Sequence, residues 1–351
     1  MSETFEINGR AVGAGHPTYI IAEMSANHGH DFQEARRIVE LAAEAGADAV
    51  KLQTYRADTM TIDCDKDYFT IGEGTEWEGQ NLYELYEDAY TPWEWHGDLK
   101  DYANDLGMDL FSTPFDESAV DFLEELEVPA YKVASFEMTH LPLLKKIAST
   151  DKPIIMSTGM ASLGEIDESV RAIRSVGDTP LILLKCTSAY PAPAEEANLK
   201  TIPHLADAFG VHTGLSDHTL GTAVPVTSVA LGACVIEKHF IRDREEVESA
   251  DSSFSLEPDE FSRMVDEVRT AEKAVGEVAY DVTDSQEAST AFRRSVFAVE
   301  DIKAGEAFTR ENTRVIRPGY GLAPKQYGNV LEHEAAEDIE RGTPIQWELL
   351  G

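Results

Sequence analysis

The stretch IAEMSANHGHDFQEARRIVELAAEAGADAVKLQTY, residues 21–55, decides the fold. It begins and ends in short apolar runs, Thr18–Met24 and Ala49–Thr54, which have the length and composition of buried strands. Between them, residues 32–46 repeat apolar side chains at helical spacing and end at a glycine, as helices often do. A strand, a helix and a second strand in this order predict a parallel sheet.

The same alternation continues to about residue 276. Six more strands are expected: Asp109–Pro114, Ala130–Ala134, Pro153–Thr158, Leu181–Cys186, Val211–Ser216 and Cys234–Phe240. Eight strand–helix units favour a closed barrel over an open doubly wound sheet, and no GxGxxG motif follows the first strand. We therefore expect an α/β protein with a (β/α)8 TIM barrel over residues 1–284.

Two segments depart from this rhythm. Residues 55–92 are rich in aromatic side chains and are expected to form an insertion over the barrel mouth, although a plain surface loop is the alternative. Residues 285–351 contain short alternating runs separated by turn signals, which predict a small, mainly β domain. A domain of about 60 residues has a marginal core, so we expect it to dock on another surface.

The composition restricts the possible partners. The chain has 29 basic and 65 acidic residues, a net charge of −36, which disfavours binding to nucleic acid and to anionic membranes. The acidic residues are spread along the chain, which favours adaptation to high salt over a simple gain in solubility. Three isolated cysteines, no signal-peptide pattern in residues 1–17 and no long apolar run predict a soluble cytoplasmic protein.

Lysines lie on the predicted strands, where an unpaired charge is costly to bury. The four are Lys51, Lys132, Lys185 and Lys238. Lysines beside serine and threonine hydroxyls suit a phosphate-bearing anion, whereas the alternative is local pairing with Glu23, Glu137 or Glu237. Because alternate residues of a strand face into and out of a barrel, some of the four must be structural.

Two histidines end the last two predicted strands. His218 and His239 both follow polar or charged neighbours, unlike histidines of an apolar core. Two neutral imidazoles on adjacent strands can share a divalent metal ion, with water and ligand oxygens in the other positions. Hydrogen bonding or general-base catalysis is the alternative role for the pair.

The motifs resemble those of the sialic acid (nonulosonic acid) synthase family. The similarity includes residues 21–55 and the segments STPFD, PAYKVASFE, IIMSTGM, GLSDHTLG and EKHF. The segment RRSVFAVEDIKAGEAFTRENTRVIRPGYG, residues 293–321, resembles the antifreeze-like (SAF) domain of that family, so that the match runs over about residues 5–351 in the same order. YTPWEWH (90–96), KCTSAYPAP (185–193) and ADSSFSLEP (250–258) look more like the pseudaminic acid synthase branch than the N-acetylneuraminate branch.

This resemblance implies an enzyme that condenses phosphoenolpyruvate with a diacetamido hexose. His218 and His239 would bind a divalent ion (Mn²⁺, Mg²⁺ or Co²⁺), Glu23 would lie beside the reacting centre, and Arg317 would reach the acetamido group of the sugar across the interface of a domain-exchanged homodimer. The implied phosphoenolpyruvate contacts are Lys51, Thr113, Lys132, Ser135, Ser157, Ser188 and Ser216. The implied sugar contacts are Gln53, Glu137, Tyr190 and Asp251. Ser188 stands where the family usually has asparagine, which puts that contact in question.

Three alternatives remain open at this stage. The first is the same reaction on another hexosamine, as in N-acetylneuraminate or legionaminate synthases. The second is a barrel aldolase that forms a Schiff base on Lys132 or Lys185. The third is a sugar-phosphate-binding module without catalytic activity.

Overall fold

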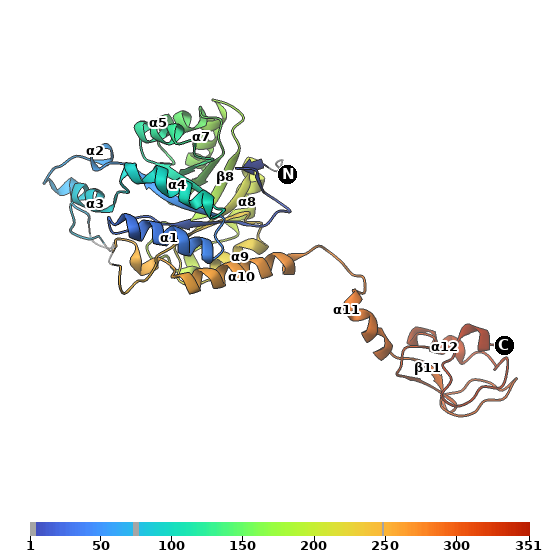
Figure 1. The fold of residues 1–351 in the computed structure, drawn as a ribbon. Helices are drawn as coiled ribbons and strands as arrows, with labels where there is room; N and C mark the ends of the chain where they lie inside the picture. The colour runs from blue at the N-terminus through green and yellow to red at the C-terminus, as the bar shows by residue number, and fades with distance from the viewer. Residues whose placement is uncertain (1–4, 73–76, 248) are drawn as a thin grey trace. The chain divides into compact units, whose positions relative to one another are not determined.

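The computed structural model describes residues 5–72, 77–247 and 249–351 of the chain (Figure 1). The chain divides into two compact units, Met1–Gly276 and Glu277–Gly351, and each is described by itself. The boundary expected after residue 284 lies within the second of these units, just before its first regular sheet.

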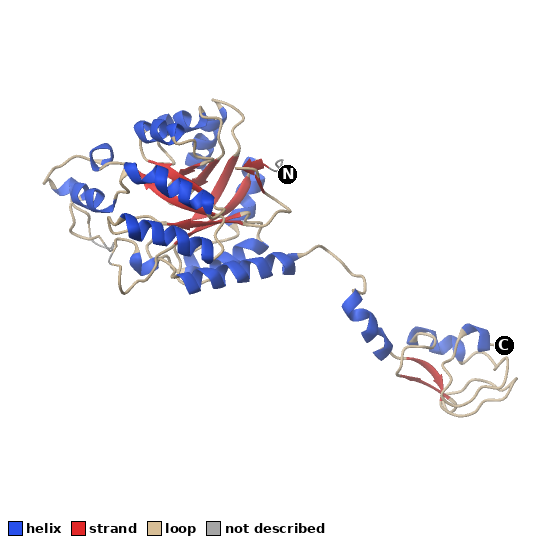
Figure 2. Cartoon of the chain, in the orientation of Figure 1, coloured by secondary structure: helices blue, strands red, loops and turns tan. Residues whose placement is uncertain are grey.

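The first unit contains a closed barrel of eight parallel strands, which confirms the expected fold (Figure 2). The strands pair in chain order, and the last pairs with the first to close the barrel. They are β3 (Tyr19–Glu23), β4 (Ala49–Thr54), β5 (Asp109–Pro114), β6 (Tyr131–Val133), β7 (Ile154–Ser157), β8 (Leu181–Cys186), β9 (His212–Asp217) and β10 (Val235–His239).

Helices surround the barrel and bury their apolar faces against it. They are α1 (Phe32–Glu44), α4 (His96–Asp105), α5 (Glu117–Glu125), α6 (Leu141–Ala148), α7 (Leu163–Arg174), α8 (Thr201–Phe209), α9 (Ala223–Ala230) and α10 (Pro258–Val275). In α1, Ile38 and Val39 are fully buried in a cluster that also contains Val50 and Leu52 of β4. The Asp31 side chain accepts hydrogen bonds at the start of this helix, a cap that contributes about 1 kcal/mol.

The alternation of side chains along β4 determines which residues reach the barrel interior. Val50 and Leu52 pack outward against the helices, whereas Lys51 and Gln53 point inward toward the cavity described below. Whether a polar side chain near the end of a strand faces the cavity or the helices therefore depends on its position in this alternation.

An N-terminal hairpin, which the sequence pattern did not reveal, covers the barrel at the start of its strands. It consists of β1 (Phe5–Ile7) and β2 (Arg10–Val12). Ile7 and Val12 are fully buried in the same cluster as Ile21 of the barrel. The Asn8 amide donates a hydrogen bond of 2.8 Å to Asp109, the first residue of β5. This end of the barrel is thus closed by apolar side chains.

The segment between β4 and α4 forms the expected insertion, and its residues 73–76 lie outside the described part of the chain. Its elements are α2 (Ala57–Met60), η1 (Asp67–Phe69), α3 (Leu82–Ala89) and η2 (Trp93–Trp95). The Trp77 indole donates a hydrogen bond of 3.1 Å to the carbonyl of Ala250, in the loop after β10. The insertion, which follows β4, therefore contacts the loop after β10, two strands away in the barrel.

The second unit has a small core of its own, formed by side chains such as Val296, Phe308 and Ile345. A two-stranded antiparallel sheet and several isolated bridges hold it, which agrees with the small C-terminal domain expected from the sequence. Its elements are α11 (Asp284–Glu287), η5 (Ala288–Phe292), β11 (Ser295–Ala298), β12 (Thr313–Ile316), η6 (Pro324–Gln326), α12 (Tyr327–Val330) and η7 (Trp347–Leu349).

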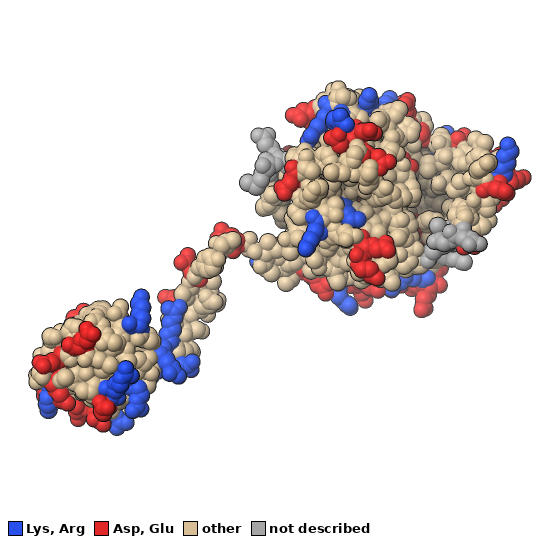
Figure 3. All heavy atoms as spheres, turned by 180° about the vertical axis from the view of Figure 1, so that it is seen from behind, with Lys and Arg blue, Asp and Glu red and all other residues tan. Residues whose placement is uncertain are grey.

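Charged side chains are scattered over the visible surface of each unit rather than gathered in one patch (Figure 3). Among the described helices, none has the length and hydropathy needed to span a membrane.

Candidate active site

The carboxyl ends of the strands and the insertion enclose a cavity of about 390 Å³, a size suited to a small-molecule ligand. Its floor is polar and charged, and its outer wall is largely apolar. The polar lining residues are Glu23, Ser25, Lys51, Gln53, Lys132, Ser135, Glu137, Ser157, Tyr190, Ser216, His218, Glu237, His239 and Asp251. Most of the candidate residues thus come together in one place.

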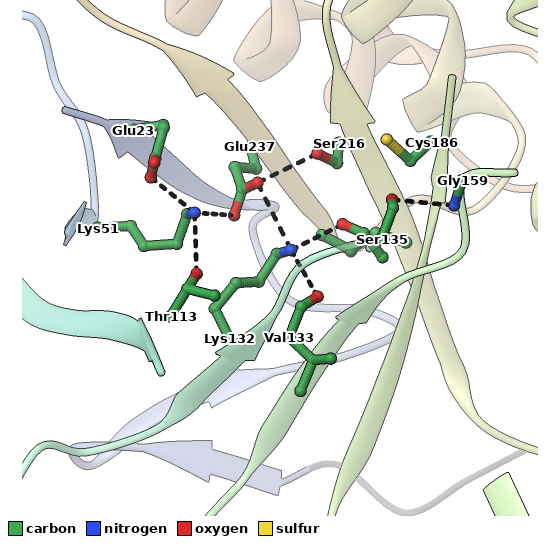
Figure 4. Close-up of polar contacts among 12 residues, drawn as sticks. Glu23, Lys51, Thr113, Lys132, Val133, Ser135, Gly159, Cys186, Ser216 and Glu237 are labelled. Carbon is green, nitrogen blue, oxygen red and sulfur yellow. Dashed lines mark hydrogen bonds and ion pairs between the residues drawn. The ribbon is translucent and has the colours of Figure 1, made fainter. Parts of the chain in front are cut away.

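Lys51 lies at the floor of this cavity, among acidic and hydroxyl groups (Figure 4). Its Nζ is 2.8 Å from Glu23 Oε2 and donates a hydrogen bond of 3.2 Å to Thr113 Oγ1. Thr113 does not line the cavity, so it contacts Lys51 rather than the open space. Lys51 is 4% exposed, and a charge so deeply buried requires these partners.

Lys132 lies across the floor from Lys51 and is 1% exposed (Figure 4). Its Nζ donates hydrogen bonds of 2.7 Å to Ser157 Oγ and 2.9 Å to the carbonyl of Val133. Burial lowers the pKa of Lys132, while the nearby Glu237 carboxylate opposes that shift. Two lysines on different strands therefore face one small space, which suits an anion with more than one charge.

Two carboxyl groups of the cavity, those of Glu23 and Glu137, have raised pKa values. Burial raises the pKa of Glu23 to about 7, although Lys51 acts in the opposite direction. Burial also raises the pKa of Glu137 to about 7, and its Oε2 has no hydrogen-bond partner among the described residues. Carboxyl groups that titrate near neutrality can exchange protons with a reacting ligand.

Gly159 brings the backbone close to two serines. Its N–H donates a hydrogen bond of 3.0 Å to Ser135 Oγ. A Cβ atom at this position would lie 2.7 Å from Ser135 Oγ and 2.3 Å from Ser188 Oγ, so only glycine fits without displacing them. Ser188 is not among the residues that line the cavity, unlike Ser135.

His218 and His239 face one another at the ends of β9 and β10, with ring centroids 5.3 Å apart. His218 Nδ1 is 3.0 Å from the carbonyl of Thr187 and donates to it, which leaves Nε2 as the acceptor. Burial lowers the pKa of His239 well below its usual value, and its Nδ1 has no hydrogen-bond partner in the described part of the chain. Asp251 Oδ2 is 3.8 Å from that nitrogen.

This donor set fits a divalent ion only in part. The described residues contain no cluster of three or more His, Cys, Asp or Glu side chains arranged to hold a metal. Two imidazoles on adjacent strands, with His239 Nδ1 unpartnered among the described residues, nevertheless suit an ion that takes its other ligands from water and substrate, as catalytic metal sites do.

The family is evident from comparison with known proteins. A model of the NeuB family matches residues 38–280, and a model of the SAF domain matches residues 293–351. The chain belongs to the NeuB family.

Individual relatives of this NeuB-family chain match nearly its whole length. A pseudaminic acid synthase of Campylobacter jejuni is 45% identical over 93% of this chain and 95% of its own length. An N,N'-diacetyllegionaminic acid synthase of Legionella pneumophila is 37% identical over 99% of both. The crystal structure of an N-acetylneuraminic acid synthetase from Leptospira borgpetersenii, in complex with citrate, has 31% identity and a TM-score of 0.73 over 82% of this chain and 95% of that one.

The four strand lysines separate into two pairs in this NeuB-family barrel. Lys51 and Lys132 line the cavity, whereas Lys185 and Lys238 do not. Lys185 donates to the carbonyl of Cys186 and to Thr187. It is therefore excluded from the Schiff-base chemistry considered for it, because a reacting lysine must reach the bound substrate.

Lys238 lies on β10 and is fully buried, with its side chain on the outer side of the barrel. It reaches the end of the neighbouring strand β9. Its Nζ forms an ion pair with Asp217 and donates to the carbonyl of Thr219. Asp217 and Lys238 directly adjoin His218 and His239 in sequence, so this pair fixes the strand ends that carry them. The sequence placed polar residues here but did not indicate this bracing role.

The apolar wall of the cavity comes from the insertion between β4 and α4. It contains Met60, Ile71, Trp77, Leu82, Leu85 and Tyr86. The segment Tyr90–Trp93, at the end of the insertion, does not line the cavity. The Trp93 ring instead stacks on Phe122, with ring centroids 4.6 Å apart, and donates to the carbonyl of Tyr55.

The remaining candidates occupy different surroundings. The Tyr190 ring lies between His218 and Trp77, with centroids 4.4 Å and 5.6 Å away, and so connects the histidine pair to the apolar wall. Arg317 belongs to the second unit, where it directly follows β12.

Proposed function

We propose that the chain is a pseudaminic acid synthase. It condenses phosphoenolpyruvate with 2,4-diacetamido-2,4,6-trideoxy-altropyranose and releases pseudaminic acid and phosphate. The observation that carries this proposal is the pair Lys51 and Lys132 at the floor of a cavity whose outer wall is apolar. The lysines suit the anionic phosphoenolpyruvate, and the wall suits a sugar that lacks the 6-hydroxyl group.

The charges at the floor of the cavity suit the reaction that the resemblance to these synthases implies. C3 of phosphoenolpyruvate attacks the aldehyde carbon of the open-chain sugar, and positive charge develops at C2. Water then adds at C2, and phosphate leaves by cleavage of the C–O bond. Glu23 and Glu137 are placed to stabilise that charge or accept the proton of the water, because their carboxyl groups titrate near neutrality.

Phosphoenolpyruvate is held by Lys51, Lys132 and the nearby hydroxyl groups in this proposal. Ser135, Ser157 and Ser216 line the cavity beside the lysines and can donate to anionic oxygens. Thr113 acts from behind this layer through its hydrogen bond with Lys51, and Ser188 lies beside Gly159 outside the cavity lining.

The sugar is assigned to the outer half of the cavity. Gln53, Glu137, Tyr190 and Asp251 all line it and provide polar contacts next to the apolar wall. N-acetylneuraminate and legionaminate synthases perform the same chemistry on other hexosamines, and the higher identity to a pseudaminic acid synthase, 45% against 37%, favours the diacetamido altrose sugar.

A panel assay tests the function. The protein is incubated with phosphoenolpyruvate and each candidate hexosamine, and phosphate release is measured. The largest kcat/KM is expected for the 6-deoxy diacetamido altrose sugar. An equal or larger kcat/KM for N-acetylmannosamine or the legionaminate precursor would contradict the proposed sugar, and no release with any of them would contradict the reaction.

We also propose that His218 and His239 bind a divalent ion (Mn²⁺, Mg²⁺ or Co²⁺). The ion would supply Lewis-acid polarisation of the sugar aldehyde. Extensive chelation should abolish turnover, and elemental analysis should find less than one equivalent of metal in the His239→Ala variant. Full turnover after chelation, or a variant that keeps one equivalent, would refute the site.

A Schiff-base aldolase is the second candidate, because burial lowers the pKa of Lys132 and so favours a neutral, nucleophilic amine. The hydrogen bond from Lys132 to Ser157 instead favours an anion-binding role. Borohydride added during turnover separates the two, since only the aldolase would form a covalent adduct that mass spectrometry detects on Lys132.

We propose in addition that two chains exchange their C-terminal domains in a homodimer. Arg317 would then reach the acetamido group of the sugar in the barrel of the other chain, where its planar guanidinium can donate to the carbonyl oxygen. A cytoplasmic location agrees with the three free cysteines, Cys64, Cys186 and Cys234. Adaptation to high salt agrees with the net charge of −36.

A further inference from the structure

Glu237 occupies the space between the two lysines of the cavity (Figure 4). It lies on β10 and points into the barrel, where it lines the cavity and is 5% exposed. Its Oε1 is 3.7 Å from Lys132 Nζ, and its Oε2 is 3.8 Å from Lys51 Nζ. One carboxylate therefore balances two cations on different strands.

The contacts of Glu237 with the lysines are long. Both N–O distances exceed hydrogen-bond length, and the lysines direct hydrogen bonds to other groups, Lys51 to Thr113 and Lys132 to Ser157. The only hydrogen bond that holds the carboxylate comes from Ser216 Oγ, at 3.1 Å, and its Oε2 has no such partner among the described residues. Charge, rather than a fixed set of hydrogen bonds, keeps Glu237 between the lysines.

A carboxylate held in this way is a counter-ion that another anion can replace. Glu23 already pairs with Lys51 at 2.8 Å, whereas the ion pair that Lys132 forms among the described residues is with Glu237. Two buried ammonium groups that share one counter-ion would be costly, so a second negative charge is needed between them. A phosphate or carboxylate group that enters between the lysines meets the same two cations and repels Glu237.

We propose that Glu237 is a positioning residue that stands in for the anionic substrate: it keeps the lysines paired in the empty site and weakens the binding of any anion that takes its place. The inference rests on the proposed function, since it takes phosphoenolpyruvate and product phosphate as the competing anions. The weaker binding would help the product leave, because without Glu237 the Lys132 ammonium group would lack a paired carboxylate and would hold phosphate more tightly.

Substitution of Glu237 by glutamine tests this proposal, because the proposal expects the affinity for anions to increase rather than decrease. Glu237→Gln keeps the size and the contact with Ser216 but removes the charge. Isothermal titration with phosphoenolpyruvate, and separately with inorganic phosphate, should show on the order of tenfold tighter binding for both anions, as expected when one partly screened like charge is removed. Unchanged or weaker binding would overturn the inference, because a residue that contacts the ligand or maintains the fold can only lose affinity.

Two further variants keep the test decisive. Glu168→Gln, at an exposed position on α7, removes the same charge far from the cavity and controls for the change in net charge. Glu237→Asp draws the carboxylate back by one methylene and should tighten binding by a smaller factor. If the glutamine variant does not fold, the aspartate variant carries the test, and affinity at or below that of the wild type overturns the inference.

The wild-type titration separates this inference from the proposed function. If the wild-type protein binds neither phosphoenolpyruvate nor inorganic phosphate, the proposed function fails and the role of Glu237 fails with it. If the wild type binds both and the glutamine variant binds no more tightly, only the role of Glu237 is refuted.

Discussion

Replacement of Gly159 by alanine should damage substrate binding with little effect on the fold. The new Cβ would lie 2.3 Å from Ser188 Oγ and 2.7 Å from Ser135 Oγ, so both hydroxyl groups must rotate or shift. The backbone of Gly159 does not require a positive φ, so alanine itself is not strained there. The variant thus perturbs two side chains of the candidate phosphate site through one added methyl group.

The magnitude follows from the hydrogen bonds at stake. A hydrogen bond from a hydroxyl to a charged ligand is worth about 1.5–3 kcal/mol, and each 1.4 kcal/mol changes binding by about tenfold. We therefore expect the KM for phosphoenolpyruvate to rise by about 10- to 100-fold. The unfolding free energy should fall by no more than about 2.5 kcal/mol, because overpacking costs about 1–3 kcal/mol and the replacement of glycine offsets about 0.4–1 kcal/mol of it.

The assay is steady-state phosphate release at varied phosphoenolpyruvate, together with a thermal melt. Gly164→Ala is the matched control, since the nearest atom to its new Cβ is 3.9 Å away. A double variant that also carries Ser188→Ala should be no worse than Gly159→Ala alone, because it removes the tightest contact. A folded Gly159→Ala protein with a KM within about twofold of the wild type would refute the reasoning.

Three other predictions concern titration, packing and assembly. Burial raises the pKa of Glu137 from 4.5 to about 7. The stability that the protonated Glu137 contributes is therefore present below about pH 4.5 and is lost as the pH rises through 7. The melting temperature of Glu137→Gln relative to the wild type should rise between about pH 5 and 7, and a constant difference would contradict the raised pKa. Lys238→Met leaves a buried carboxylate unpaired and should cost about 3–5 kcal/mol in chemical denaturation. Lys303→Ala, at an exposed ion pair that solvent screens, should cost far less than Lys238→Met, and equal losses would refute the difference. Mixing inactive Arg317→Ala and Lys132→Ala chains should restore activity at about a quarter of all sites if domains are exchanged, whereas inactive mixtures that demonstrably exchange subunits would show that each cap serves its own barrel.

The sequence predicted most of the barrel because its strands are short, apolar and separated by helices of clear periodicity. Three strands, such as Ala49–Thr54, have the predicted bounds, and the others differ by one or two residues. The N-terminal hairpin was missed because its strands have three residues each and only Ile7 and Val12 are fully buried, too few to show a pattern.

The sequence predicted which residues belong to the candidate site better than how those residues are arranged. Motifs indicated which strand ends carry polar residues, but whether Lys51 or Lys185 faces the interior depends on where each strand starts within the barrel. The insertion was expected over the mouth, but nothing in its composition shows that Trp77 lines the cavity while Trp93 packs on Phe122. Glu237 was considered only as a structural partner, since its place between two lysines arises from strand pairing.

The charge of this protein is arranged in two layers that can be altered independently. Lys51 and Lys132 are buried and neutralised by neighbours within the barrel, whereas the acidic excess is spread along the chain and contacts solvent. Salt screens the outer layer over about 10 Å at 0.1 M and acts much less on buried pairs. Ionic strength should therefore govern how often an anionic substrate reaches the barrel mouth, while the interior determines how long it stays. The surface could accordingly be redesigned for fresh water or brine with the floor of the cavity left unchanged.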